Sequence, residues 1–204
     1  MNYQTIGIKK RIDAYHRKKH QLIVQHEVGH YIVAKILGFE VNDISIVFFD
    51  LQGAHQGGSG LMLIEKITSV EATIQYLENR IIVLYAGALA QTLQNSKANI
   101  EEANELLLRG GSQNDYAKIR ELTRLLRNLK YPKTKCNDIA QNELDNISDS
   151  LFLKALKIIE KEANLIVGVS GKIESETYNT NEKLIFSKED LDEIPIFRER
   201  FPKN

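Results

Sequence analysis

The segment from residue 22 to residue 37 most constrains the fold, because it is apolar almost all the way round the helix that its pattern predicts. Three of its few polar side chains, His26, Glu27 and His30, fall within five residues. A helix that is apolar on every side is buried in a protein core. We therefore expect a helical core around a helix of about residues 8 to 37, ended by a left-handed cap at Gly38.

The five residues His26-Glu27-Val28-Gly29-His30 have the spacing H-E-x-x-H. On a helix, positions i and i+4 lie on one face, so both imidazoles can reach a single metal ion, for which zinc is the best match. Glu27 lies about 100° further round and can reach a water on the metal. The motif predicts metal-assisted hydrolysis, with His26 and His30 as ligands and Glu27 as the catalytic base. The alternative, histidines satisfied by hydrogen bonds within the core, stays open.

Length and charge set the wider limits. A chain of 204 residues with 43% apolar residues can bury one sizeable core, so we expect a single domain over residues 1–204. Its catalytic core would span about residues 8 to 130 and a helical C-terminal part about residues 137 to 204. Basic and acidic residues number 27 each, so no net charge attracts nucleic acid, and none is expected as a partner.

Cysteine content and hydropathy bear on the compartment. The one cysteine, Cys136, excludes a disulfide within the chain and favours a reducing environment. The first ten residues lack the apolar region of a secretory signal, and no run reaches the roughly 18 apolar residues of a transmembrane segment. We expect a soluble cytoplasmic protein with no transmembrane segment.

Apolar periodicity and turn residues predict the remaining elements. Residues 41–49 and 60–65 are expected to form two strands, joined by a glycine-rich connection into a hairpin beside the motif helix. Helices are expected at about residues 69–93, 100–108, 112–129 and 142–167, followed by a short strand and a helical turn capped by Ser187. The fold class is therefore mainly α, with a small β-hairpin or sheet beside the active-site helix.

Two histidines are an incomplete site, because a catalytic zinc ion normally has three protein ligands. The extended motif H-E-x-x-H-x-x-G-x-x-H is absent, since Val33 and Ile36 stand where it requires glycine and histidine. A glutamate on a later helix, as in thermolysin-like enzymes, would be Glu71 or Glu78. Another candidate is Asp115, at the start of a helix after a glycine turn.

With Asp115 as the third ligand, the sequence resembles the FtsH-type zinc peptidases, which combine H-E-x-G-H with a distant T-G-A-x-x-D-L run. Residues 110–116 resemble that run, residues 43–46 the strand after the motif, and residues 82–90 the apolar helix with small residues. The resemblance extends over about residues 20 to 195. It implies an FtsH-peptidase-like helical metallopeptidase domain, with one zinc ion per chain held by His26, His30 and Asp115.

The chain also departs from that family. Ala88 and Gln91 stand where the family helix usually carries arginine and glutamate. Family members carry an ATP-driven unfoldase domain before the peptidase, and this chain has no room for one. The resemblance therefore leaves two questions open: whether a separate ATPase or adaptor is a partner, and whether the chain forms a homo-oligomer.

The expected activity is that of a zinc-dependent metalloendopeptidase, which hydrolyses peptide bonds in unfolded or flexible protein segments. An extended substrate is expected along the strand edge at Gly60, Leu61, Met62 and Leu63, where backbone hydrogen bonds bind peptides with little regard to sequence. The alternative is a catalytically inactive or regulatory metal-binding interaction module of the same fold.

Four other side chains can be placed in advance. His16 and His20 are also four residues apart, but lysine and arginine separate them, so we expect both at the surface. His55 is either an exposed loop residue or a donor to a transition-state oxyanion. Tyr31 lies in an apolar helical stretch and is expected in the core.

Overall fold

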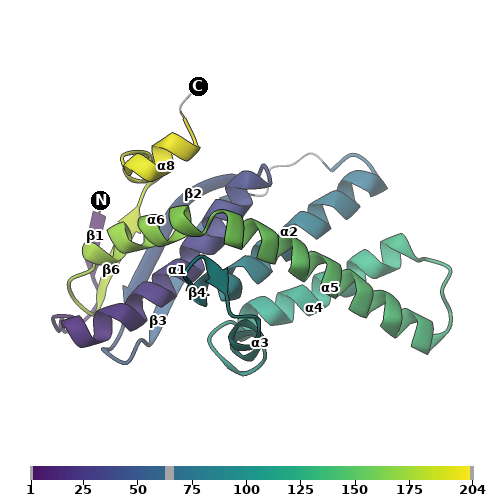
Figure 1. Cartoon of the computed structure of the whole chain (residues 1–204), viewed down its shortest axis with the longest axis horizontal. Helices are drawn as coiled ribbons and strands as arrows, with labels where there is room; N and C mark the ends of the chain where they lie inside the picture. The colour runs from purple at the N-terminus through teal and green to yellow at the C-terminus, as the bar shows by residue number, and fades with distance from the viewer. Residues whose placement is uncertain (1, 63–66, 203–204) are drawn as a thin grey trace.

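A four-stranded antiparallel sheet lies at one end of the molecule and a pair of long helices at the other (Figure 1). The computed structural model describes residues 2–62 and 67–202, and it confirms a mainly helical fold with a small sheet. The elements are β1 (Asn2–Thr5), α1 (Ala14–Ile36), β2 (Glu40–Phe48), β3 (His55–Met62), α2 (Val70–Gln91), β4 (Leu93–Gln94), β5 (Lys97–Ala98), α3 (Ile100–Arg109), α4 (Gln113–Lys130), α5 (Asn137–Lys161), α6 (Ala163–Ser175), β6 (Glu182–Phe186), α7 (Lys188–Asp192) and α8 (Pro195–Arg200).

The motif helix α1 begins later than its pattern predicts. The Asp13 side chain accepts a hydrogen bond from the backbone N–H of His16 at 3.1 Å and caps the helix there. Before that point the backbone is extended, because Lys10 and Ile12 hydrogen-bond to residues 178–180 of a distant segment. The expected end is confirmed: Gly38 has a φ of 85°, the left-handed conformation that glycine adopts without strain.

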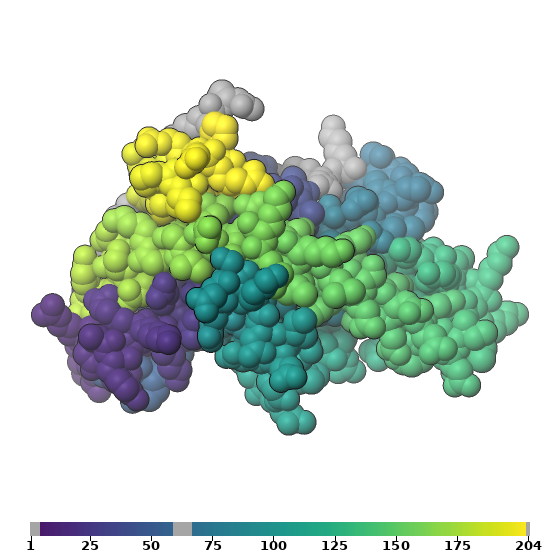
Figure 2. Space-filling view, viewed as in Figure 1, coloured from purple at the N-terminus to yellow at the C-terminus, as the bar shows by residue number. Residues whose placement is uncertain are grey.

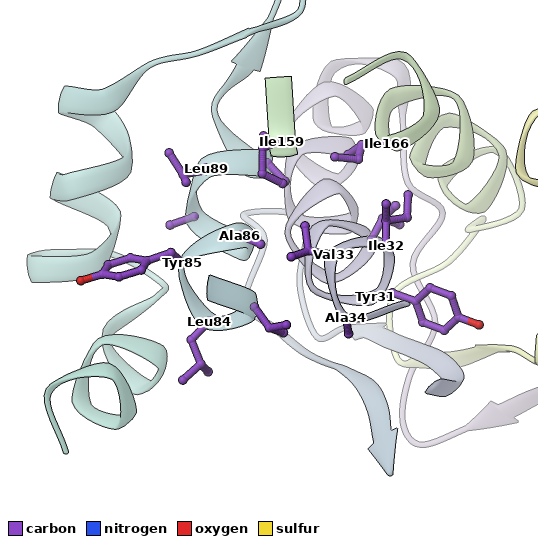
Figure 3. Packing of buried hydrophobic residues seen from close by; sticks show 14 of the residues in the cluster. Tyr31, Ile32, Val33, Ala34, Leu84, Tyr85, Ala86, Leu89, Ile159 and Ile166 are labelled. Carbon is purple, nitrogen blue, oxygen red and sulfur yellow. The ribbon is translucent and has the colours of Figure 1, made fainter. Parts of the chain in front are cut away.

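Helices α1 and α2 cross closely in the middle of the core. A β-carbon at Gly29 would lie 2.4 Å from the β-carbon of Ala90 and 2.8 Å from the carbonyl oxygen of Ala86, so only glycine fits at this crossing. Figure 3 shows Val33 and Ala86 between the two helices, with Tyr31 pointing away from that contact. The small residues of α2 therefore bring its backbone against α1.

These two helices are long and rich in apolar residues, yet their hydropathy stays below that of a membrane span. Among residues 2–62 and 67–202, no helix is both long and apolar enough to cross a bilayer.

The sheet has the strand order β1-β6-β2-β3, and α1 packs against β2 and β3. The predicted hairpin of β2 and β3 is confirmed, but β6 and β1 extend it on the far side of β2. Strand β3 begins at His55 rather than residue 60, so Gly57 and Gly58, expected in the connection, belong to the strand, whereas Gly53 precedes it. The expected end of this strand at residues 63–65 lies outside the described residues. In the described sheet, β1 and β3 are the two edge strands, and β3 is the one beside α1.

The predicted helix 142–167 is in fact two helices, and its expected end at residue 167 is wrong, because the second helix continues to Ser175. Helices α5 and α6 meet at Glu162, whose carboxylate accepts two hydrogen bonds of 3.0 Å from Arg200 of α8. A β-carbon at Gly168 would lie 3.4 Å from the Ile196 side chain, so α6 runs through this glycine in contact with α8. Figure 2 shows α5 and α6 as a continuous surface across this face of the molecule.

Candidate metal centre

One turn of α1 carries the three polar groups of the motif into the interior. His26, Glu27 and His30 are all buried, with at most 8% of each residue exposed. The helix period places the two imidazoles side by side, and their ring centroids lie 4.6 Å apart with the rings nearly perpendicular. The two Nε2 atoms are 3.0 Å apart. Two ring nitrogens thus face one point beside α1.

Asp115, in the first turn of α4, reaches the same point. Its Oδ2 lies 3.1 Å from Nε2 of His26 and 3.2 Å from Nε2 of His30. Among the described residues these three form the one group of histidine, cysteine or acidic side chains close enough together to hold a metal ion. The structure therefore brings together the three ligands that the sequence predicts.

Hydrogen bonds on the far side of the rings fix how the imidazoles are turned. Nδ1 of His30 lies 2.7 Å from the backbone carbonyl oxygen of Val83, to which it must donate. In the neutral ring Nε2 then carries a lone pair directed at the cluster. Nδ1 of His26 lies 3.5 Å from Oγ of Ser112, the residue before α4. Such contacts are those that orient metal-binding histidines.

The charge of Asp115 favours binding of a cation by the cluster. Burial raises the pKa of Asp115, but hydrogen bonding to His26 and His30 outweighs burial and holds the pKa well below its usual range. Burial lowers the pKa of His30, yet the Asp115 carboxylate more than offsets this effect and raises it overall. The carboxylate is therefore ionised and attracts a cation to the point where the rings meet.

The donor set and its spacing fit a metal ion. A tetrahedral zinc ion with bonds of about 2.0 to 2.1 Å spaces its ligand atoms roughly 3.3 Å apart. The spacings of 3.0, 3.1 and 3.2 Å among His26, His30 and Asp115 are close to that value. Two imidazoles and one carboxylate also leave a fourth position open, as catalytic zinc sites do.

Helix α2 closes one side of the cluster with a glycine. A β-carbon at Gly87 would lie 2.5 Å from Nε2 of His30 and 2.7 Å from Cε1 of His26. The imidazoles therefore rest against bare backbone at this position. The absence of a side chain at Gly87 thus permits close packing, and the group packed there is the candidate ligand pair.

Glu27 lies between α1 and the edge strand. A β-carbon at Gly57 of β3 would lie 2.4 Å from Oε1 of Glu27, so the carboxylate rests against the backbone of that strand. Its oxygens make no hydrogen bond or ion pair with any residue that the structure describes. The carboxylate lines the cleft described next.

A cleft of about 390 Å³ opens beside the cluster. Residues 55–58 of β3 line one wall, and α1 and α4 contribute the cluster. Sequence reasoning missed two cationic lining residues, Arg80 of α2 and Lys118 of α4, and it named the lining residue Gln91 of α2 only as a departure from the FtsH pattern. A signal was present, because Arg80, Leu84, Gly87 and Gln91 recur at the spacing of one helix face, and Lys118 follows Asp115 by three residues.

The rival third ligands lie elsewhere. Glu78 binds Lys130 at 2.7 Å and lies 3.7 Å from Lys154, while Glu71 is exposed in the first turn of α2. Neither belongs to the cluster around His26. The thermolysin-like arrangement therefore has no support from the geometry.

The remaining histidines are placed differently from one another. His20 is fully buried and stacks on Phe48, so the expectation that it lies at the surface is wrong, whereas His16 is partly exposed and bonds to Asp13. His55 is exposed and lines the cleft. Its Nδ1 donates to the carbonyl oxygen of Gly53 at 2.8 Å, so its Nε2 can donate to a substrate only when the ring is protonated.

The predicted substrate-binding segment follows the cleft-lining residues along β3. Gly60, Leu61 and Met62 belong to this strand, with Leu61 opposite Val41, while Leu63 lies outside the described residues. The cleft is lined by the earlier part of the strand, residues 55–58. Substrate binding at residues 60–62 stays a prediction.

Comparison with known proteins does not assign the chain to a family. No protein-family model matches it, and no curated protein matches it either. The functional argument therefore rests on the residues of the site.

Proposed function

We propose that the protein is a zinc-dependent metalloendopeptidase that hydrolyses unfolded or flexible protein segments. The observation that carries this proposal is the meeting of Nε2 of His26, Nε2 of His30 and Oδ2 of Asp115 within 3.2 Å, next to the Glu27 carboxylate. This combination resembles the FtsH-type peptidases. The three residues would hold the ion, and Glu27 would act in proton transfer.

The division of labour follows from the donor set. When bound, zinc acts as a Lewis acid on a carbonyl oxygen and lowers the pKa of a coordinated water from 15.7 to about 7. Glu27 takes the proton of the attacking water and returns it to the leaving amine, acting first as base and then as acid. The backbone of Gly57 keeps the Glu27 carboxylate close to the cleft.

The substrate class follows from the edge strand. Strand β3 pairs with β2 on one side, and its other side is an edge in the described sheet. An extended peptide can add to such an edge through main-chain hydrogen bonds, which form with little dependence on the peptide's sequence. Only an unfolded or flexible segment can adopt that conformation, so delivery of folded substrates would require a separate ATPase or adaptor.

The test combines metal analysis with cleavage. The purified protein should contain one zinc ion per chain and should cleave an unfolded casein-like substrate, and a chelator should stop the cleavage. Glu27→Gln should retain zinc and cleave the substrate about 10²- to 10⁴-fold more slowly, because a general base contributes a rate factor of that size. Undiminished cleavage by Glu27→Gln would refute the mechanism. Stoichiometric zinc without cleavage of any substrate would favour the inactive or regulatory metal-binding module.

A further inference from the structure

Arg80 is a charged group of the cleft that peptide hydrolysis, as proposed above, does not use. It lies on α2, lines the same cleft as the metal cluster and is half-buried. Its guanidinium makes no hydrogen bond or ion pair with any residue in the described parts of the chain. A guanidinium has five N–H donors and stays charged in proteins, so burial without a partner has a cost that an anionic ligand would remove.

The surroundings of Arg80 confirm that its charge is not fully compensated. Burial lowers the pKa of the guanidinium, and the opposing electrostatic effects of Tyr76 and then Asp115 offset only part of that decrease. Asp115 is itself committed to His26 and His30. The protein thus keeps a partly desolvated cation at the cleft, and the carboxylate of Asp115 is hydrogen-bonded to the two imidazoles rather than to Arg80.

The helix period sets the place of Arg80 along the cleft. Gly87, which rests against the imidazoles, follows Arg80 by seven residues, so the two backbone positions lie on one helix face about 10 Å apart. An extended chain rises about 3.3 Å per residue, so this span corresponds to about three residues of a bound peptide. Arg80 is therefore placed to contact a group some three residues from the bond that is cut.

Lys118 adds a second positive charge to the same cleft. It lies on α4, one turn after Asp115, is exposed and has no ion-pair partner among the described residues. Two acidic side chains line the cleft: Asp115, which belongs to the metal cluster, and Glu27, the proposed base beside it. The wall formed by Arg80 and Lys118 is therefore cationic.

We propose that Arg80, assisted by Lys118, forms a carboxylate-binding subsite that selects substrates with a carboxylate about three residues from the scissile bond. This inference rests on the proposed peptidase function and narrows its substrate class. Two kinds of group can supply the carboxylate: an acidic side chain or the free C-terminus of the substrate. Arginine binds a carboxylate through two parallel hydrogen bonds, which gives such a subsite orientation as well as charge selectivity.

Peptide binding to the zinc-loaded full-length Glu27→Gln protein tests the subsite without turnover. Three peptides of one sequence are compared by calorimetry: one with internal glutamates and an amidated end, one with glutamines and a free C-terminus, and one with glutamines and an amidated end. A charged hydrogen bond to a carboxylate should make one of the first two bind about tenfold or more tightly than the third. The peptide that gains affinity identifies the source of the carboxylate.

Added substitutions assign the preference to Arg80. Arg80→Gln should remove most of the affinity difference between the carboxylate-bearing and neutral peptides, and Lys118→Gln should remove a smaller part. Arg198→Gln, on the exposed face of α8, is the control and should leave the difference unchanged. The zinc dissociation constant, measured in parallel, should not change. Weaker zinc binding in Arg80→Gln with an intact carboxylate preference would overturn the proposal and make Arg80 a residue that positions Asp115.

The two levels of inference can fail separately. Equal binding of all three peptides overturns the subsite, and cleavage of casein by the unmodified protein would then leave the peptidase function standing. A carboxylate preference that depends on Arg80 in a protein that cleaves nothing would support the subsite and refute the peptidase function.

Discussion

Gly87 lies directly against His30, so close that a β-carbon on Gly87 would be 2.5 Å from Nε2 of the imidazole. That nitrogen is also 3.0 Å from Nε2 of His26 and 3.2 Å from Oδ2 of Asp115. The atom proposed to bind metal is thus the one that a side chain on α2 would meet first. A single missing methyl group on one helix makes room for the ligands of another.

Gly87→Ala should therefore weaken zinc binding without unfolding the protein. Alanine favours a helix more than glycine does, but its methyl group would push the His26 and His30 rings out of line with Asp115. We expect zinc affinity to fall about 10- to 100-fold, the usual effect of disturbing the groups that orient metal ligands. Competition with a chromophoric chelator measures the affinity, and thermal unfolding checks the fold.

Gly111→Ala is the matched control, because a β-carbon there would meet no atom within 4 Å. It should leave zinc affinity unchanged. Equal zinc affinity of Gly87→Ala and the unmodified protein would show that the rings do not bind the metal in the observed arrangement.

Gly57→Ala should separate catalysis from metal binding. Its β-carbon would lie 2.4 Å from Oε1 of Glu27, so this carboxylate must move, while His26 and His30 keep their positions. We expect kcat on an unfolded protein substrate to fall about tenfold or more, because proton transfer depends on hydrogen-bond distance, with zinc content retained. Gly58→Ala, where a β-carbon has no neighbour within 4 Å, should keep normal kcat. Matching kcat values for the two variants would argue against Glu27 as the base.

Asp115→Ala should abolish stoichiometric zinc, whereas Glu71→Ala and Glu78→Ala should keep it. Within residues 2–62 and 67–202, the Asp115 carboxylate is the one acidic group that reaches both imidazoles, and Glu78 is engaged by Lys130 at 2.7 Å. Loss of that exposed ion pair should cost no more than about 1 kcal/mol of stability. Zinc content measured by atomic emission decides between the ligands, and a zinc-free Glu71→Ala or Glu78→Ala protein would restore the thermolysin-like alternative.

The sequence predicts best what local periodicity controls. His26 and His30 come together because they are one helical turn apart, and the buried setting of Glu27 follows from the apolar residues around it. Asp115 is a different case, because it lies 85 residues after His30. Helical spacing carries no information over that separation, and only the order of motifs singled out this aspartate among the acidic residues.

What the sequence does not reveal depends on pairing between distant segments. Helix α1 starts at residue 14 because residues 10–12 hydrogen-bond to residues 178–180, which competes with helix formation. Helix α6 runs through Gly168 because α8 packs there, at a place where helix propensity alone predicts an end. Arg80 was missed because the sequence does not show that this position of α2 lines a cleft, and without the cleft an arginine on a helix face suggests no binding role.

His20 gives the clearest expectation for pH dependence. The buried ring stacks on Phe48 with centroids 4.0 Å apart, and neither ring nitrogen has a hydrogen-bond partner among the described residues. Burial lowers the pKa of His20 and outweighs the opposing effects of the Leu51 backbone and Asp50, and repulsion from His16 and Lys19 adds to the decrease. In the unfolded chain His20 has the ordinary pKa of about 6.5. Just below that pH it is therefore protonated in the unfolded chain but stays neutral in the folded chain.

The free energy of unfolding should consequently fall as the pH drops below about 6.5, by up to about 1.4 kcal/mol per pH unit for this one group. His20→Leu keeps an apolar side chain against Phe48 and should remove that part of the slope. Urea unfolding measures the change in the free energy of unfolding between pH 7.5 and 5.5 for both proteins, with chelator present. His26 and His30 contribute equally to that change in both, so the difference between the two proteins reports on His20. Parallel losses of stability in the two proteins would mean that His20 takes up its proton equally well in the folded and unfolded states.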